Sequence, residues 1–424
     1  MCPPEIATSS GSATTQSGRH RLFGWELVGL LWLAYFLNQG DRQIFGVTLS
    51  LIRGEFHLSD TQMGLIATTF SIVFGIFVPI AGWLGDRFRR DMVVVASLVV
   101  FSLGTLLTGV ASSFLLLLLF RGIATGVGEA LYAPAANTLI SEHHDTTRGR
   151  ALSLHQTANY TGVVLGSFIA GSLADHFGWR FAFLTFGGVG LLWSMVILVR
   201  VRSRGPSPIA QERKKESFLL GEAFRRIVAT PALIAQTIGF SGLVFILVGY
   251  LTWMPSLLAE RFHLSLAEAG FQSVAWHHIL AYIGLLVAGT AGDHLSIVWP
   301  RFRLLSMGIS LLFFAPFLLI SAKAMSSLTL YLALAAFGFF RGIYDAGLYA
   351  AIFERVENRL RASVTGLIVA VAYVVGALSP LIMGALRQHY GLEAGMEVLA
   401  GSAFIAGLAF LIIVLRSGRE VIAA

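Results

Sequence analysis

The chain has 424 residues, of which 56% are hydrophobic and only 12% are charged, and its formal net charge is +7. Because soluble domains carry about 25% charged residues, this composition excludes a soluble globular protein, a disordered chain and a disulfide scaffold. It indicates a protein whose solvent is mostly lipid.

Residues 1–22 are rich in Ser, Thr and Gly and contain no apolar run. They predict a disordered cytoplasmic tail and do not resemble a secretory signal peptide. Twelve apolar stretches follow, each with the roughly 20 residues that a helix needs to cross a bilayer. Helices are expected because backbone groups in hydrocarbon must satisfy their own hydrogen bonds. The stretches cover residues 24–51, 62–85, 91–111, 114–140, 150–174, 179–200, 229–258, 267–291, 302–321, 326–351, 362–386 and 394–415.

The longest polar stretch, residues 201–226, divides these stretches into two sets of six. We therefore predict an all-α polytopic membrane protein with two six-helix lobes. The N-terminal lobe is expected at 23–200, a cytoplasmic linker at 201–226, the C-terminal lobe at 227–416 and a short cytoplasmic tail at 417–424.

An even number of crossings places both termini on one side of the membrane. Of the 30 Lys and Arg residues, 22 fall on the side of the termini, five on the opposite side and three inside apolar stretches. The positive-inside rule then predicts cytoplasmic termini, and we expect a bacterial inner membrane. This distribution also explains the basic composition without a nucleic-acid partner.

Four charged residues lie deep inside the first and fourth stretches: Asp41, Arg42, Arg121 and Glu129. A charge at this depth costs at least about 2.5–3.5 kcal/mol, so each is a candidate functional residue. From the helical rise, Asp41 lies about 16 Å from the outer end of its helix, between Arg121 at about 10 Å and Glu129 at about 22 Å. Arg42–Glu129 and Asp41–Arg121 pairs are both possible if the two helices share a cavity.

These charges suggest proton coupling. Burial favours the protonated form of a carboxylate, whereas a nearby arginine favours the ionised form. An arginine that moves toward or away from the acid therefore lets it carry one proton in each conformational cycle. We expect Asp41 and Glu129 to be the proton-coupled acids, with Arg42 as the mobile partner and Arg121 in the same set. The alternative is a set of static ion pairs that hold the helices in register.

The stretch from Gly82 to Arg90 closes the second helix at the cytoplasmic side. Its small residues allow helices to approach closely. Asp86 is placed to cap a helix N-terminus and to pair with basic residues of a neighbouring loop. We expect Gly82, Asp86, Arg87 and Arg90 to form a latch that holds this side closed.

Other buried polar residues are weaker candidates. Arg341 and Asp345, four residues apart, are expected to form a local structural pair. His155 is expected in a wet position near the cytoplasmic end of its helix, and His277 and His278 either line a cavity or pack against their neighbour Trp276. Because none of these histidines has metal-ligand spacing, we expect no metal and no cofactor.

The two halves of the chain resemble each other. FHLSDTQMG at 56–64 is echoed at 262–270, PIAGWLGD at 79–86 is echoed at 286–293, and FRGI at 120–123 recurs at 340–343. Three matches in the same order indicate a duplication. Parallel repeats of this kind build two-lobed secondary transporters, with the site between the lobes.

The stretch 82–90 resembles the loop 2–3 signature of the major facilitator superfamily, as do Arg121 with its glycines and Gly178-Trp179-Arg180-Phe181. The resemblance covers residues 24–415 and implies the major facilitator fold. Two positions depart from the pattern: Arg89 replaces the usual glycine of the loop, and His294 replaces the arginine of its second-half copy.

Within that superfamily, Asp41-Arg42, the loop 85–90 and the segment from Arg121 to Tyr132 resemble the spinster family. This resemblance implies proton sensing by the Asp-Arg pair and Glu129, and a lysophospholipid or sphingoid lipid as substrate. It implies a monomeric, proton-driven transporter that works by alternating access. An organic-anion or drug transporter of the same superfamily is the alternative.

In the superfamily fold, helices 1, 4, 7 and 10 face the cavity. Each polar residue expected there can equally form a hydrogen bond between helices. The candidates for substrate binding are Tyr35, Asn38, Tyr132, Gln156, Asn159, Gln236, Ser241, Trp253, Tyr344 and Tyr349.

Other classes explain less of the sequence. Gly239-Phe240-Ser241-Gly242 matches the pattern of an intramembrane serine hydrolase, with His277 one helix away, but that scheme gives the duplication and the buried charges no role. The sequence contains neither a phosphate-binding loop nor a selectivity-filter motif. We therefore expect a transporter rather than an enzyme, an ATP-driven pump or a channel.

Overall fold

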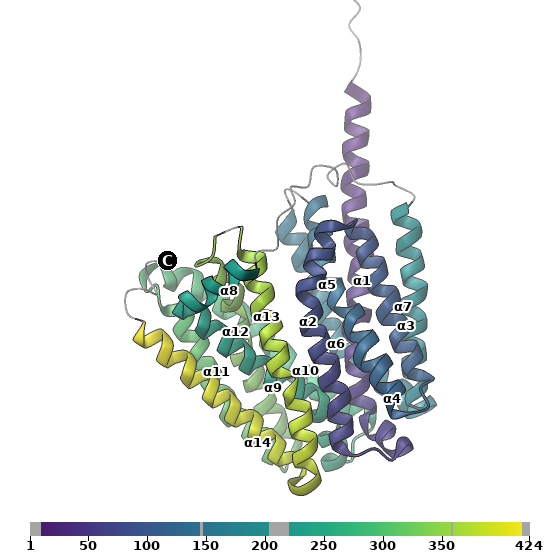
Figure 1. Cartoon of the computed structure of the whole chain (residues 1–424), viewed down its shortest axis with the longest axis vertical. Helices are drawn as coiled ribbons and strands as arrows, with labels where there is room; N and C mark the ends of the chain where they lie inside the picture. The colour runs from purple at the N-terminus through teal and green to yellow at the C-terminus, as the bar shows by residue number, and fades with distance from the viewer. Residues whose placement is uncertain (1–9, 145–146, 203–219, 358, 418–424) are drawn as a thin grey trace, which may run out of the picture.

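The apolar stretches form helices in the computed structural model of the chain, which describes residues 10–144, 147–202, 220–357 and 359–417 (Figure 1). The side chains of residues 10–22, Asp86, Arg202 and Asp293 lie outside this description. In chain order the helices are α1 (Ser10–Phe56), α2 (Asp60–Arg87), α3 (Arg90–Gly109), α4 (Phe114–Leu117), the π-helical segment η1 (Leu118–Ala124), α5 (Thr125–His143), α6 (Arg148–Phe177), α7 (Trp179–Arg202), α8 (Leu220–Ala229), α9 (Pro231–Phe262), α10 (Leu266–Val298), α11 (Phe302–Lys323), α12 (Ser327–Phe353), α13 (Arg361–Gly376) and α14 (Leu378–Arg416).

The twelve predicted crossings correspond to these helices. Within the described residues, nine helical segments are long and apolar enough to cross a membrane. Polar residues interrupt α1 and α6, which are not among the nine. The segment 361–416 is counted as one of the nine, although it contains two predicted stretches, 362–386 and 394–415. These two stretches are separated by Gly391, which breaks the helical backbone of α14 with a φ of 78°. The predicted all-helical, two-lobed fold is confirmed.

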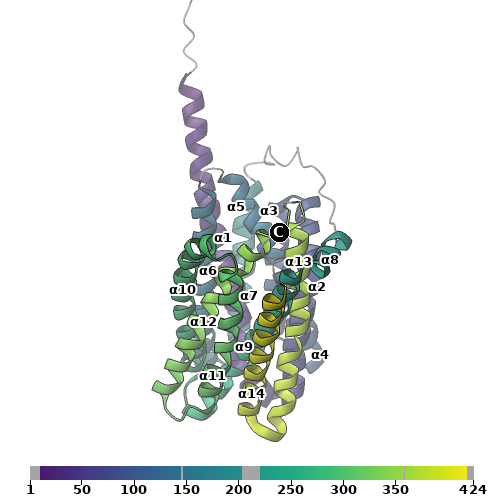
Figure 2. The same ribbon diagram turned by 90° about the vertical axis from the view of Figure 1, so that its left-hand side faces the viewer.

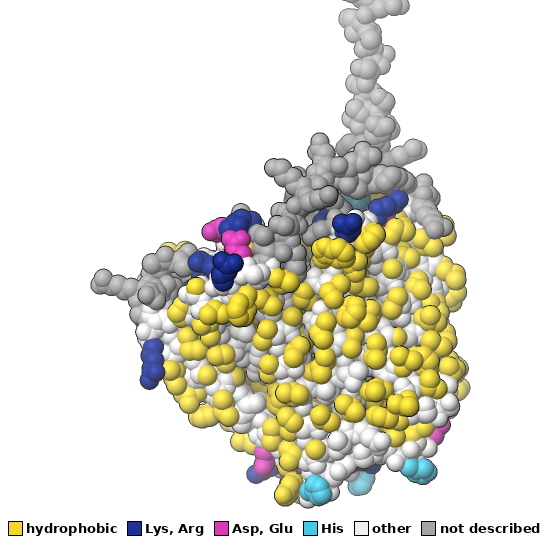
Figure 3. Space-filling view, in the orientation of Figure 1, with side chains coloured by type: hydrophobic (Ala, Val, Ile, Leu, Met, Phe, Trp, Pro, Cys, Tyr) yellow, Lys and Arg dark blue, Asp and Glu magenta, His cyan; other side chains and the backbone are white. Residues whose placement is uncertain are grey.

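Helices α1–α7 form one bundle, the N-lobe, and α8–α14 form a second bundle beside it, the C-lobe (Figure 1). The N-terminal end of α1 and the C-terminal end of α14 lie at the same end of the molecule in both ribbon views (Figure 2). Hydrophobic side chains form a broad band across the visible face, and Lys and Arg gather at its upper edge, on the side of these ends (Figure 3). This distribution is typical of an integral membrane protein.

Two expected boundaries differ from the structure. Helix α1 begins at Ser10, inside the stretch 1–22 that the composition predicts to be disordered, because the first crossing helix continues toward the N-terminus. The linker 201–226 contains the start of α8, an amphipathic helix that buries Ala223 and Ile227. Residues 1–9, the linker segment 203–219 and the tail residues 418–424 lie outside the described residues.

The repeat seen in the sequence has the same local structure in both lobes. Ser59 caps α2 and Ser265 caps α10, each in a capping box with the residue three positions later, Gln62 or Glu268. The histidines that precede these caps, His57 and His263, both have a positive φ, of 51° and 52°. The matching caps make α2 and α10 equivalent elements of the two lobes.

Candidate functional site

A cavity of about 920 Å³ lies between the two lobes. Its walls come from α1, α2, α5 and α6 of the N-lobe and from α9, α10, α12 and α13 of the C-lobe. The lining continues to Gly85, Arg90, Arg148 and Arg361, which lie at helix ends on the side of the termini. The cavity therefore opens on that side.

The lobes meet on the opposite side. Asp175 of α6 accepts hydrogen bonds from the first two backbone N–H groups of α10, at 3.1 Å from Leu266 and 2.9 Å from Ala267. Arg387 of α14 pairs with Asp60 of α2 at 3.3 Å. A carboxylate is stabilised at a helix N-terminus, so Asp175 acts as a clasp between the lobes.

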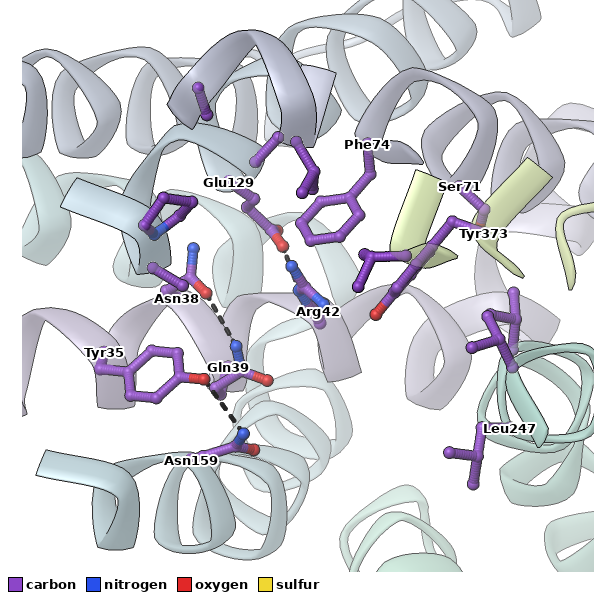
Figure 4. Close-up of a pocket in the computed structure, with 18 of the residues that line it drawn as sticks. Tyr35, Asn38, Gln39, Arg42, Ser71, Phe74, Glu129, Asn159, Leu247 and Tyr373 are labelled. Carbon is purple, nitrogen blue, oxygen red and sulfur yellow. Dashed lines mark hydrogen bonds and ion pairs between the residues drawn. The ribbon is translucent and has the colours of Figure 1, made fainter. Parts of the chain in front are cut away.

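The four charges predicted at bilayer depth meet beside the cavity. Arg42 of α1 forms an ion pair with Glu129 of α5, whose side chain is fully buried (Figure 4). One nitrogen of Arg121, Nη1, lies 3.8 Å from Asp41 and 3.8 Å from Glu129. Both pairings that the sequence leaves open therefore occur, and Arg121 links the two acids.

Several polar atoms of this cluster remain unsatisfied. Thr105 of α3 donates a hydrogen bond to Asp41 Oδ2 at 2.7 Å. Asp41 Oδ1, Glu129 Oε1 and Arg121 Nη1 are buried without a hydrogen-bond partner among the described residues. Since an unsatisfied buried polar atom costs free energy, this is a place where a proton or a ligand group adds a bond.

Aromatic rings surround the two arginines. The guanidinium carbon of Arg42 lies 4.3 Å from the ring centre of Phe74, and that of Arg121 lies 4.9 Å from the ring centre of Phe70. Arg121 itself belongs to the π-helical segment η1, a rare conformation that occurs frequently at functional sites. The wider turn contributes to the placement of Arg121 between the two acids.

A polar wall from α1 and α6 continues from the charged cluster. Asn159 donates a hydrogen bond to the Tyr35 hydroxyl at 3.1 Å, and Gln39 donates to Asn38 at 2.9 Å (Figure 4). Together with Tyr349 of α12, the predicted residues Tyr35, Asn38 and Asn159 line the cavity. Four of the ten candidate binding residues thus reach it.

The other six candidates lie away from the cavity lining. Two of them form hydrogen bonds inside the protein: Tyr132 donates to the Leu31 carbonyl at 2.6 Å, and Trp253 donates to the Pro380 carbonyl at 3.1 Å. Gln236, Ser241 and Tyr344 are buried, and Gln156 is exposed on α6. Helix orientation, which the sequence does not specify, decides these placements.

Two of the three candidate histidines differ from expectation, and His278 matches it. His155 is fully buried rather than wet, and its ring stacks on Tyr35 at 4.8 Å. His277 packs against Tyr250 at 5.1 Å, and its Nε2 has no hydrogen-bond partner among the described residues, so it does not activate Ser241. His278 lines the cavity.

The predicted latch residues lie at the cavity mouth. Gly82 and Arg90 line the cavity, and Arg90 pairs with Glu142 of the same lobe. Arg87 is exposed, 5.8 Å from the ring centre of Trp83, and the side chain of Asp86 lies outside the description. The cavity is open at this mouth.

Sequence reasoning missed several residues of the site. Thr105, Phe70 and Phe74 bind or cover the charged cluster, and Tyr373 lines the cavity beside Arg42 (Figure 4). Threonine and aromatic residues are ordinary in membrane helices, so no local signal separates them from packing residues.

The sequence profile of the Major Facilitator Superfamily matches residues 31–380. The hexuronate transporter of Bacillus subtilis (strain 168) is 28% identical over 92% of this chain and 94% of its own length. Protein spinster homolog 1 of Xenopus tropicalis is 32% identical over 55% of this chain, a match that spans 45% of that protein. A solved structure described as a bacterial homolog to the human lysosomal transporter Spinster has a TM-score of 0.78, with 20% identity and coverage of 92% of this chain and 96% of that one. The chain belongs to the Major Facilitator Superfamily and resembles its spinster transporters.

Proposed function

We propose that the protein is a proton-coupled secondary transporter that moves an amphipathic substrate by alternating access. The observation that carries this proposal is the buried cluster of two acids and two arginines beside a cavity open on one side. In the proposed orientation, the open side faces the cytoplasm of a bacterial cell and the termini lie there.

Charge balance supports a coupling role for Glu129. With both acids ionised, two carboxylates balance Arg42 and Arg121. A proton on Glu129 removes one negative charge and weakens its pair with Arg42, so that the guanidinium becomes available to another anion or to water. The same proton gives one of the unsatisfied acid oxygens a hydrogen to donate, which lowers the cost of the rearrangement.

The cavity walls differ in polarity in a way that suits an amphipathic molecule. Tyr35, Asn38 and Asn159 form the polar side, on α1 and α6. An apolar wall faces the cavity from α2 and α9, formed by Phe74, Val78, Phe240, Val244 and Leu247. A lysophospholipid or a sphingoid lipid has this division between head and tail, and the similarity to spinster homolog 1 agrees with it.

A small organic anion is the second candidate, because the hexuronate transporter matches nearly the whole chain and the cavity is lined by several arginines. In either case, Gly82, Asp86, Arg87 and Arg90 are proposed to close the mouth in the alternate state.

Transport by the purified protein in proteoliposomes tests the proposal. Asp41→Asn and Glu129→Gln are expected to abolish uptake driven by a pH gradient. Glu397→Gln is the matched control, since Glu397 pairs with Lys323 at 2.9 Å at the surface, with 47% of its side chain exposed. Wild-type rates in both cluster variants would refute proton coupling through these acids.

A further inference from the structure

The geometry points to an anion-binding subsite formed by Arg341 and His278 on the C-lobe wall of the cavity. It takes the carboxylate, phosphate or sulfate group of the transported molecule. This inference rests on the proposed function, because it assumes that the cavity holds the substrate, and it specifies the substrate as an anion.

Arg341 lies in the cavity lining on α12 and is only partly neutralised. Its Nε lies 3.3 Å from Asp345 Oδ2, but that nitrogen makes no hydrogen bond among the described residues. The Arg341 Nη1 atom lies 3.5 Å from His278 Nε2. This is the one hydrogen-bond contact of the Arg341 side chain in the described part of the chain. A guanidinium carries five N–H donors in a fork that matches a carboxylate or a phosphate. The Nε donor is buried beside Asp345, but the remaining hydrogens on Nη1 and Nη2 make no other hydrogen bond in the described part of the chain and are available to a ligand.

His278 orients Arg341 without cancelling its charge. The ring Nδ1 lies 2.9 Å from the Val274 carbonyl, so the proton belongs on Nδ1 and the Nε2 lone pair faces Arg341. The ring is held by His277, at 4.1 Å between centroids, and by Tyr160 of the N-lobe at 6.0 Å. A neutral acceptor in this position fixes the guanidinium, whereas a carboxylate there would neutralise it.

The other arginines of the cavity are committed elsewhere or lie at its mouth. Arg42 is paired with Glu129 and packs on Phe74, and Arg121 lies 3.8 Å from both Asp41 and Glu129. At the mouth, Arg361 donates to the backbone carbonyls of Val356 and Phe353 at 3.1 Å and 2.8 Å. Arg341 is thus the deep cationic group best placed to receive an anion.

The neighbouring wall indicates where the rest of the ligand lies. Phe240, Val244, Leu247, Val248 and Leu251 of α9 line the same cavity and present an apolar surface. An acidic head at Arg341 leaves this surface for an acyl chain. The same acidic chemistry also occurs in a small free anion such as a hexuronate, so the test must distinguish the two sources.

Affinities of the purified full-length protein for four probes test the subsite. Three probes share one acyl chain: monoacylglycerol phosphate, which is anionic, monoacylglycerol phosphocholine, which is zwitterionic, and monoacylglycerol, which is neutral. The fourth is glucuronate. The wild type is expected to bind the anionic amphiphile at least about tenfold more tightly than the neutral one, the scale of a charge-assisted hydrogen bond.

Three variants locate that preference. Arg341→Gln is expected to remove the anion preference and to leave the affinity for monoacylglycerol unchanged, which also serves as the folding control. Asp345→Asn is expected to strengthen anion binding severalfold, a gain that a misfolded protein does not show. Arg361→Gln, at the cavity mouth, is the matched control and should keep the wild-type preference.

Equal wild-type affinities for the anionic and neutral amphiphiles, with no glucuronate binding, would overturn the subsite. An unchanged anion preference in Arg341→Gln would overturn it as well. Arg341-dependent binding of glucuronate alone would support the subsite and reject an amphipathic substrate. Proton coupling is tested separately, by the transport rates of Asp41→Asn and Glu129→Gln.

Discussion

At the scale of single residues, the charged cluster is stabilised by mutual neutralisation rather than by solvent. Arg42 and Glu129 are paired, Arg121 lies 3.8 Å from both acids, and Thr105 satisfies one oxygen of Asp41. Removal of one member of such a set leaves a buried charge without its partner, which costs several kcal/mol in general. Each member therefore constrains the protonation state of the others.

A second charged pair, between Glu55 outside the predicted spans and Arg180 at the start of the span 179–200, gives a pH-dependent prediction. Glu55 follows the span 24–51. It accepts a hydrogen bond from Trp179 at 2.6 Å and forms an ion pair with Arg180 at 2.6 Å. The Trp179 hydrogen bond, followed by the Arg180 interactions, lowers the pKa of Glu55 below its ordinary value. The stabilisation is thus present above the ordinary Glu pKa of about 4.3 and is lost as the pH falls through the lower folded value.

Glu55→Gln is therefore expected to lower the melting temperature at pH 7. The loss in the free energy of unfolding is at most about 1 kcal/mol, because the pair is largely exposed. Thermal unfolding of both proteins between pH 7 and pH 3 checks this. The two curves should converge at acidic pH, and a difference that grows on acidification would contradict the assignment.

The residue scale also shows the limit of prediction from sequence. Asp41, Arg42, Arg121 and Glu129 are recognisable because charges are rare in apolar stretches, and the structure brings all four together. The cavity-facing side of each helix is not recognisable in the same way. Tyr132 and Trp253 have the same chemistry as Tyr35 and Tyr349, yet they donate to backbone carbonyls inside the lobes.

At the scale of helices, close packing depends on glycines at crossing points. A Cβ on Gly166 of α6 would overlap the Cα of Gly40 in α1, and a Cβ on Gly162 would lie 2.7 Å from the Phe36 carbonyl oxygen. Small residues at such crossings let two membrane helices approach closely. The α1–α6 crossing supports both the charged cluster and the polar wall.

Gly166→Ala is expected to destabilise the protein by about 1–3 kcal/mol, the usual cost of overpacking, because the neighbouring atoms belong to the backbone and cannot rotate away. Gly401→Ala is the matched control in α14, where an added Cβ meets open space. The control should be neutral or slightly stabilising, because alanine favours a helix. Melting temperatures in detergent compare the two, and equal values would contradict this account of the crossing.

The helices themselves were largely predictable, since hydrophobic length identifies membrane crossings. The π-helical segment η1 was not, because the composition of residues 118–124 does not distinguish a π-helical turn from an ordinary α-helical one. The start of α8 was also missed, because its apolar face is short and lies within a polar linker.

At the scale of the whole molecule, the lobes are clasped on one side and separated on the other. The clasp consists of Asp175 at the N-terminus of α10 and the Arg387–Asp60 pair. The sequence predicts two lobes from its repeat, but it does not specify which side is open. Both states of an alternating-access protein share one sequence and differ by a small free energy.

Asp175→Ala is expected to shift the population toward separation on the clasped side, because it leaves two N–H groups of α10 without acceptors. Spin labels at Phe177 and Lys323, on exposed positions of the two lobes, report the distance in a Cys2→Ser background. The distance distribution of the variant should gain a longer component. An unchanged distribution would show that the clasp does not hold this state.

The central claim is that Glu129 exchanges a proton as Arg42 changes partners during transport. The most direct measurement is proton movement driven by a substrate gradient, followed with a pH-sensitive dye trapped inside proteoliposomes. The account predicts a proton flux with the wild type and none with Glu129→Gln, even if some substrate still crosses. A wild-type proton flux in Glu129→Gln would contradict the account.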